Sequence, residues 1–216
     1  MSLFISLEGI EGCGKTTQIK VLASRLEDLG IRVLVTREPG GCPISDQIRQ
    51  ILLNPGNNLL VAKAELLLYA AARAQHVDEI IAPALQKGAI VLCDRFSDAT
   101  LAYQGYGRGL DLELIHLLND VAAGTCRPHL TLLLDMPAEQ GITRARARNA
   151  ASAGPDEDRF EQEALAFHLK VRQGYLELAR RAPSRFRIID ADGTPEQVAD
   201  RIWQVTSAMA MAAGRA

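Results

Sequence analysis

Apolar residues gather in five short runs along the chain, and longer stretches with helical spacing separate these runs. The runs cover residues 3–7, 31–35, 89–93, 130–134 and 186–189. Strands that are apolar at nearly every position are typical of a parallel sheet covered on both faces. The runs therefore predict a five-stranded parallel sheet.

The stretches between the runs repeat apolar residues every three or four positions. Ile19, Leu22 and Leu26 follow this spacing, and Gly30 stands where a helix is commonly capped. Further helices are expected over 45–53, 62–85, 111–122, 139–148, 158–181 and 196–210. Alternating strands and helices imply right-handed crossovers, so the prediction is an α/β fold with helices on both faces, in a single domain over residues 1–216.

The composition narrows the class of protein without naming a reaction. The chain is 48% hydrophobic and 23% charged, with a net charge of −2, which gives no general attraction to nucleic acid or to an anionic membrane. No run approaches the roughly 18 apolar residues of a membrane span, and the first residues lack the pattern of a signal peptide. The four cysteines are widely spaced, which argues against a disulfide framework or a zinc site. We expect a cytoplasmic protein with neither nucleic acid nor membrane as a partner.

Residues 9–16 match the phosphate-binding pattern G-x-x-x-x-G-K-[ST] at every required position. An apolar strand precedes this segment and a helix follows it. In that setting the backbone N–H groups and the helix N-terminus form a cradle for phosphates. Lys15 can reach the β- and γ-phosphates of a nucleotide, and the Thr16 hydroxyl can ligate Mg²⁺. The loop predicts nucleotide binding but not the reaction.

Four strand ends carry polar side chains, at residues 8–9, 36–41, 94–96 and 135–137, at the edge where doubly wound sheets bind ligands. Asp94 can hold Mg²⁺ through water, and the neighbouring Arg95 offers a planar fork for phosphate. Arg37 opens a segment with one proline and two glycines, residues 37–41. This segment is either a simple tight turn or a second binding loop for an anion, and its composition leaves both open.

Several aromatic and polar groups have the size and chemistry to recognise a base. Tyr69 and Arg73 lie one helical turn apart and share a face, while Thr100, Tyr103 and Gln104 follow within one short stretch. Such groups can stack on a pyrimidine or bond to its edge, although a core-edge tyrosine and a solvated arginine are the usual explanation. The glycine-rich residues 105–109 are expected to form a flexible connection.

Arginines flank a segment of small and polar residues, 149–157, that is expected to be mobile. We predict a lid at about 141–159. Arg144 and Arg148 share one helical face, Arg146 is turned away, and Arg159 follows the segment. A lid arginine can contribute about 10³–10⁵-fold to phosphoryl transfer, whereas a solvated basic helix is the ordinary alternative.

Together these segments resemble the thymidylate kinases of the nucleoside-monophosphate kinase group, over about residues 4–202. The markers are residues 7–17, 37–41, 71–76, 94–97 and 102–105, in this order. The resemblance implies a three-layer P-loop fold and ATP-dependent phosphorylation of dTMP to dTDP with Mg²⁺. It also implies a homodimer packed through helices, for which the apolar stretch 62–85 is a candidate face, although that stretch fits a buried core helix equally well.

The resemblance also assigns roles to individual residues. The implied ATP contacts are Gly9, Ile10, Glu11, Gly12, Cys13, Gly14, Lys15, Thr16 and Thr17. The implied metal ligands are Thr16 and Asp94. The implied acceptor contacts are Arg37, Pro39, Tyr69, Arg73, Arg95, Ser97, Thr100, Tyr103 and Gln104. The implied catalytic residues are Lys15, Glu11, Arg95 and Arg148. Because the phosphate loop contains no arginine, the lid must supply one; Arg148 is the first choice and Arg144 or Arg159 the alternatives.

Three other functions would require different sequence features. A kinase for another deoxynucleoside or its monophosphate would keep the same loop, and only the acceptor pocket would differ. A GTPase-like switch needs an N-K-x-D motif to read guanine, and the chain has none. A non-catalytic interaction module would have little use for the phosphate loop, the Asp94-Arg95 pair and a basic lid together.

Overall fold

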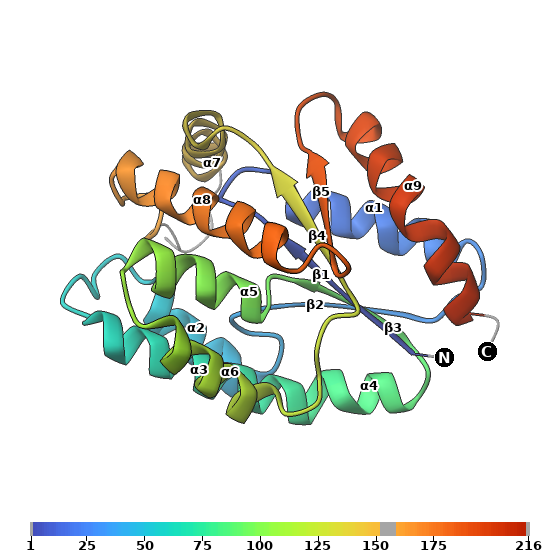
Figure 1. Cartoon of the computed structure of the whole chain (residues 1–216), viewed down its shortest axis with the longest axis horizontal. Helices are drawn as coiled ribbons and strands as arrows, with labels where there is room; N and C mark the ends of the chain where they lie inside the picture. Colours follow the sequence, from blue (N-terminus) through green and yellow to red (C-terminus); the bar gives the residue numbers. More distant parts are fainter. Residues whose placement is uncertain (1, 152–158, 215–216) are drawn as a thin grey trace.

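The computed structural model describes residues 2–151 and 159–214, which contain one five-stranded parallel sheet. The sheet has the order β2-β3-β1-β4-β5 (Figure 1). Its strands are β1 (Leu3–Glu8), β2 (Val33–Arg37), β3 (Ile90–Asp94), β4 (Leu130–Asp135) and β5 (Phe186–Asp190). This confirms the predicted α/β fold and all five strands, although β2 lies two residues further along the chain than its apolar run.

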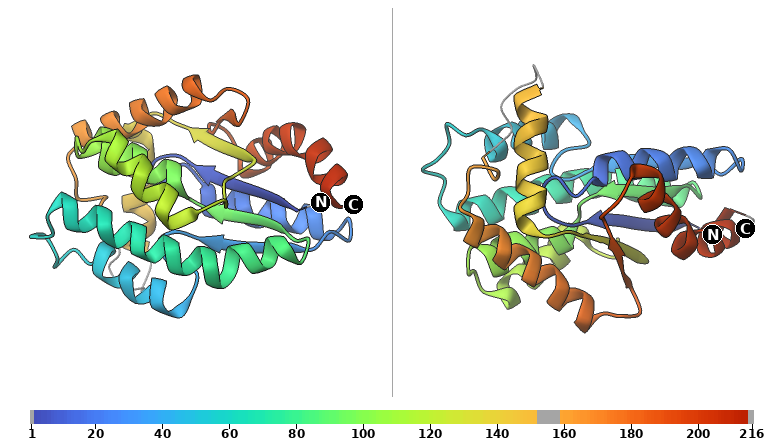
Figure 2. Two further views of the ribbon diagram at one scale, coloured as in Figure 1. Left: turned by 60° about the horizontal axis from the view of Figure 1, so that its bottom comes forward. Right: turned by 90° about the horizontal axis from the view of Figure 1, so that it is seen from above.

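Helices cover both faces of the sheet and give three layers (Figures 1 and 2). The α-helices are α1 (Lys15–Glu27), α2 (Pro43–Leu53), α3 (Ala62–His76), α4 (Ala82–Gln86), α5 (Ser97–Thr100), α6 (Leu112–Ala123), α7 (Ala138–Ala151), α8 (Leu165–Arg181) and α9 (Pro195–Gly214). Two π-helical segments are η1 (Val77–Ile81) and η2 (Leu101–Gly107).

The central strands are buried on both faces because each face packs against its own apolar cluster. Ile5 and Leu92 belong to the cluster that includes residues of α1 and α9. Phe4 and Val91, which alternate with them along β1 and β3, pack with residues of η1. A period of two thus sends neighbouring side chains of one strand to opposite layers. This explains why these strands are apolar throughout.

The register of the strands brings the polar strand ends to one edge. Leu7 of β1 pairs with Asp94 of β3, and Arg37 of β2 pairs with the same Asp94. The phosphate loop, Asp94 and the segment after Arg37 therefore start at the same level of the sheet.

Three segments differ from the sequence-based expectation, and in one of them the helix expected over 158–181 begins only at Leu165, as α8. The stretch predicted as a single helix over 62–85 contains the π-helical η1 between α3 and α4, directly before Pro83, which has no N–H to donate. Residues 101–107, which include part of the expected flexible connection, form η2 and pack tightly against α8. Within the described residues, none of the helices combines the length and apolar character needed to span a membrane.

Candidate active site

A cleft of about 910 Å³ opens at the carboxyl ends of β1, β2 and β3. The phosphate loop and the start of α1 form one wall, and residues of α3, α5 and η2 form another. Side chains from α2 and α7, with Phe160 and Glu161, complete the lining. The volume is in the range of sites that enclose small-molecule ligands.

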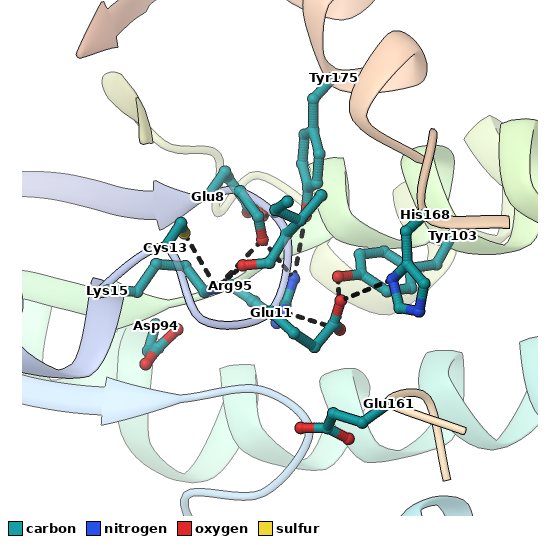
Figure 3. Close-up of polar contacts among 12 residues, drawn as sticks. Glu8, Glu11, Cys13, Lys15, Asp94, Arg95, Tyr103, Glu161, His168 and Tyr175 are labelled. Carbon is teal, nitrogen blue, oxygen red and sulfur yellow. Dashed lines mark hydrogen bonds and ion pairs between the residues drawn. The ribbon is translucent and has the colours of Figure 1, made fainter. Parts of the chain in front are cut away.

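The phosphate loop is curled by three glycines, Gly9, Gly12 and Gly14, whose φ angles of 136°, 71° and 94° disfavour other residues. The Lys15 ammonium lies over the loop and donates to the carbonyls of Gly9 and Ile10 at 3.0 and 2.8 Å. Figure 3 shows Lys15 beside the Cys13 sulfur. Lys15 also lines the cleft, so its ammonium lies where it can bind the phosphates of a nucleotide held by the loop.

Six of the predicted ATP contacts line the cleft, namely Glu11, Gly12, Gly14, Lys15, Thr16 and Thr17. Ile10 and Cys13 point into the core instead, and their side chains are buried. Gly9, Ile10 and Cys13 are not among the described residues that line the cleft, so any contribution from them comes through the backbone of the loop.

Thr16 and Asp94, which the sequence suggested as metal ligands, lie side by side in the cleft. The Thr16 hydroxyl donates to a carboxylate oxygen of Asp94 at 2.8 Å, and both residues line the cleft. Oxygen ligands of this kind suit Mg²⁺, which usually takes one or two protein ligands and completes its shell with phosphates and water. The described residues contain no cluster of three or more His, Cys, Asp or Glu side chains that could hold a metal ion.

Arg95 adopts a left-handed backbone, with φ of 68°, directly after β3. Such a conformation is unfavourable for a residue with a side chain and persists where surrounding contacts enforce it. The guanidinium donates to the Gly9 carbonyl at 2.8 Å and to Glu11 at 3.1 Å, and it stacks over the Tyr103 ring at 4.8 Å. The strained turn thus delivers Arg95 to the phosphate loop.

Glu11 lies at the centre of this network (Figure 3). Its carboxylate accepts a hydrogen bond of 2.6 Å from Tyr103 and lies 3.3 Å from Nδ1 of His168. Burial alone would raise the pKa of Glu11, but Arg95, His168, Lys15 and Tyr103 outweigh it and lower the pKa to about 2. Glu11 is therefore ionised at neutral pH.

Behind Arg95, a second buried carboxylate anchors the turn. Glu8 accepts from the backbone N–H of Phe96 at 2.7 Å and from the Tyr175 hydroxyl at 2.8 Å. Burial, together with the charge of Asp98, raises the pKa of Glu8 to about 8. Sequence reasoning missed Tyr175 and His168, and it noted Glu8 only as the polar end of an apolar strand.

Arg73 is held by a buried polar network on the opposite wall. Its guanidinium donates to Glu38 at 2.8 Å, to the side-chain oxygen of Asn119 at 2.6 Å and to the Thr100 hydroxyl at 3.0 Å. Glu38 also lies 3.1 Å from Nδ1 of His76. The structure thus brings together Arg73 and Thr100, as predicted, and adds Asn119 together with Glu38 and His76, to which the sequence analysis gave no individual role.

The other predicted acceptor contacts divide into two groups. Those that line the cleft are Arg37, Pro39, Tyr69, Tyr103 and Gln104. Ser97 is not among the described lining residues, and its carbonyl accepts from Asn119 behind the wall. Arg37 lines the cleft and pairs with Asp46 at 3.2 Å on its exposed rim. The segment after β2 is therefore part of the cleft wall and not only a turn.

The four candidate lid arginines occupy different surroundings. Arg144 and Arg148 line the cleft, and Arg148 lies 3.3 Å from Glu161. Arg146 donates to the backbone carbonyl of Glu161 and does not line the cleft. Arg159 is buried, donates to the Leu52 carbonyl and pairs with Glu65 at 2.6 Å. Residues 152–158 of the predicted lid lie outside the described residues.

The fold and the cleft define a P-loop nucleotide kinase, with a phosphate cradle on one wall and an arginine wall opposite. The family model described as thymidylate kinase matches residues 7–202. The chain belongs to the thymidylate kinase family, as the sequence motifs predicted.

Individual relatives agree with this assignment over nearly the whole chain. The chain is 71% identical over 207 residues to the thymidylate kinase of Syntrophotalea carbinolica, covering 96% of each protein. It is 59% identical over 200 residues to that of Trichlorobacter lovleyi, covering 93% of this chain and 94% of the relative. The crystal structure of thymidylate kinase from Ehrlichia chaffeensis matches with a TM-score of 0.77 at 33% identity, covering 94% of this chain and 98% of that one.

Proposed function

We propose that this chain transfers the γ-phosphoryl group of ATP to the phosphate of dTMP, giving ADP and dTDP, in the cytoplasm where both nucleotides occur. The observation that carries the proposal is one cleft in which the phosphate loop, with Arg95 against it, faces Arg73. A donor on the loop and an acceptor phosphate on the arginine wall would meet within this cleft. The family relationship, at up to 71% identity among the relatives described, supports thymidylate as the acceptor.

The ATP half of the site is built from the loop and the start of α1. Backbone N–H groups of the loop and the Lys15 ammonium hold the phosphates, and Thr17 lies at the helix N-terminus beside them. Thr16 and Asp94 would hold Mg²⁺, with Asp94 acting through water. When bound, the ion would neutralise charge on the donor phosphates.

The acceptor half is built from the opposite wall. Arg73, fixed by Glu38 and Asn119, presents its remaining donor capacity to the base or phosphate. Tyr69 supplies an aromatic surface for the pyrimidine, and Glu11 contacts the acceptor nucleotide or its metal ion. The remaining acceptor contacts are Arg37, Pro39, Arg95, Thr100, Tyr103 and Gln104.

Transfer needs no covalent enzyme intermediate, because an oxygen of the dTMP phosphate can attack the γ-phosphorus directly. The enzyme then acts by positioning the two nucleotides and by neutralising the charge that spreads over the migrating group. Lys15 and Arg95 act from the floor of the cleft, and Arg148 acts from α7. Arg144 lines the same cleft and is the alternative, whereas the buried pair with Glu65 argues against Arg159.

ADP release with different acceptors tests this function. We expect strong stimulation by dTMP, weaker stimulation by dUMP, and little by dCMP, by thymidine or without an acceptor. Strongest stimulation by another acceptor would reassign the substrate, and hydrolysis that is independent of acceptor would favour a nucleotide switch. Lys15→Met should abolish turnover with an unchanged melting temperature; activity within about threefold of the unmodified enzyme would refute the phosphate-loop assignment.

A homodimer is the assembly that the surface supports. On α6, Leu114, Leu117 and Val121 follow helical spacing and are exposed, the last two by 61% and 74%. Leu67 is exposed on the neighbouring α3. Pairing of two such faces would bury this apolar stripe. The double variant L117K/V121K should shift the sedimentation coefficient from dimer to monomer, and an unchanged dimer would exclude this face.

A further inference from the structure

The phosphate loop and α7 touch through two glycines that are far apart in sequence. A side-chain Cβ at Gly141 would lie 2.5 Å from the carbonyl oxygen of Glu11 and 2.8 Å from Cδ1 of Ile10, closer than real Cβ atoms come. A Cβ at Gly12 would in turn overlap the carbonyl of Gly141. Figure 2 shows α7 beside the loop that follows β1. The two backbones are therefore in direct contact.

Local helix formation does not explain Gly141. Glycine is the poorest helix former after proline, and Gly141 lies in the first turn of α7, which begins at Ala138. Gly12 has a left-handed φ of 71°, which accounts for its identity independently. The backbone of Gly141 has no such requirement. The close approach to Glu11 and Ile10 is the remaining physical reason for the absence of a side chain.

The face of α7 that touches the loop is also the face that carries the lid arginines. Arg144 and Arg148 lie three and seven positions after Gly141, and this spacing stacks them along one side of a helix. Both arginines line the cleft, whereas Arg146 lies off this face and bonds to the Glu161 carbonyl. The glycine contact thus sets the distance between the phosphate cradle and the arginines.

We propose that Gly141 is a positioning residue for phosphoryl transfer. By lacking a side chain, it lets α7 rest on the phosphate loop at the height at which Arg144 and Arg148 reach the migrating group. The inference rests on the proposed function, because it presumes that these arginines neutralise charge on that group. A methyl group at position 141 would push α7 away from the backbone of Glu11, which cannot move without distorting the loop.

Kinetics of Gly141→Ala test the proposal. We expect kcat to fall by about 10²-fold, the loss typical of a displacement near 1 Å, while KM for ATP and for dTMP changes less than threefold. Gln140→Ala, an exposed change in the same turn, is the matched control and should stay within twofold of the unmodified kcat. A G141A enzyme with unchanged kcat would overturn the proposal.

A double-variant comparison separates positioning from a purely structural effect. In a background that carries R144A and R148A, adding G141A should cost less than about threefold, because the arginines that it displaces are already absent. An undiminished loss in that background would overturn the proposal. ATP binding by the loop should be similar in all of these variants.

A second variant leaves the glycine contact intact, so it remains informative if G141A does not fold. In A147R/R148A the charge moves by one residue to an exposed position off the Gly141 face. We expect this variant to be as slow as R148A, and full activity would refute the importance of the face. If the unmodified enzyme shows no ADP release with dTMP, the proposed function fails. If it is active and R144A/R148A is slow but G141A is normal, only the present inference fails.

Discussion

Removing the charge of Glu38 should destabilise the protein and weaken the acceptor wall together. Glu38→Gln keeps the shape of the side chain but leaves Arg73 without its anionic partner. The side chains of Arg73, Glu38 and His76 are 1%, 4% and 0% exposed, so water cannot replace the lost charge. Removing one partner from such a buried pair costs about 3–5 kcal/mol. For a chain of this size, that corresponds to a melting temperature lower by about 6–20 °C.

Calorimetry on the unmodified and E38Q proteins measures this change directly. Asp46→Asn is the matched control because it removes the charge from the half-exposed pair with Arg37, which contributes at most about 1 kcal/mol. In steady-state assays, E38Q should raise KM for dTMP more than KM for ATP, since Arg73 lies on the acceptor wall. A melting temperature within 3 °C of the unmodified protein, with an unchanged KM for dTMP, would refute the reasoning.

Three further predictions concern the lid, a buried acid and the thiols. Arg148→Ala should lower kcat by about 10³-fold or more in an ADP-release assay, whereas Arg146→Ala should cost tenfold or less; equal losses would contradict the assignment of Arg148. Because the pKa of Glu8 is raised to about 8, the stability it contributes is complete below pH 4.5 and is lost as the pH rises to about 8. Urea unfolding at pH 5, 7 and 8.5 should therefore show E8Q gaining stability relative to the unmodified protein, and a difference independent of pH would show that Glu8 titrates normally. Iodoacetamide should label the partly exposed Cys126 before the three buried thiols, as judged by peptide mass spectrometry, and early labelling of Cys13 would contradict its burial.

The elements that could be predicted are those with local signals. The β1 and β4 strands are apolar runs flanked by polar residues, and the phosphate loop is a spaced motif between a strand and a helix. Parallel pairing then places Asp94 beside that loop, since neighbouring parallel strands end at the same edge. For these parts of the site, the order of strands and helices along the chain is enough to predict which residues lie close together.

The η2 segment could not be predicted because its structure depends on packing from elsewhere. Gly105 and Gly107 favour a flexible connection by composition. In the fold, however, the backbone of Gly105 lies against Leu112, and Gly107 lies against Phe167 of α8. Contacts with a helix that begins about 60 residues later override the local preference. Tyr103, which reaches Glu11, depends on this packing for its position.

Arg159 is a charged residue whose position likewise could not be predicted from the local sequence. Next to a segment of small residues, it is indistinguishable in sequence from Arg144 and Arg148. The structure buries it against Glu65, which is 94 positions earlier in the chain. Glu65 also accepts from Gln104 and pairs with Arg108, so this carboxylate is the centre of a structural cluster. A long-range partner, and not the local sequence, decides which arginine is available for chemistry.

The distribution of charge explains why α7 has to supply a cation. Arg73 is paired with Glu38 and Arg95 with Glu11, so part of the charge of each arginine is already offset. Lys15 donates to two neutral carbonyls and retains its charge for the donor phosphates. Two nucleotides bring several negative charges, and transfer spreads more over the migrating group. Arg148, whose side chain is 60% exposed, pairs with Glu161, and burial raises the pKa of that carboxyl. Because the Arg148 side chain is largely exposed, water screens this pair, so Arg148 can exchange Glu161 for a phosphoryl oxygen at little cost.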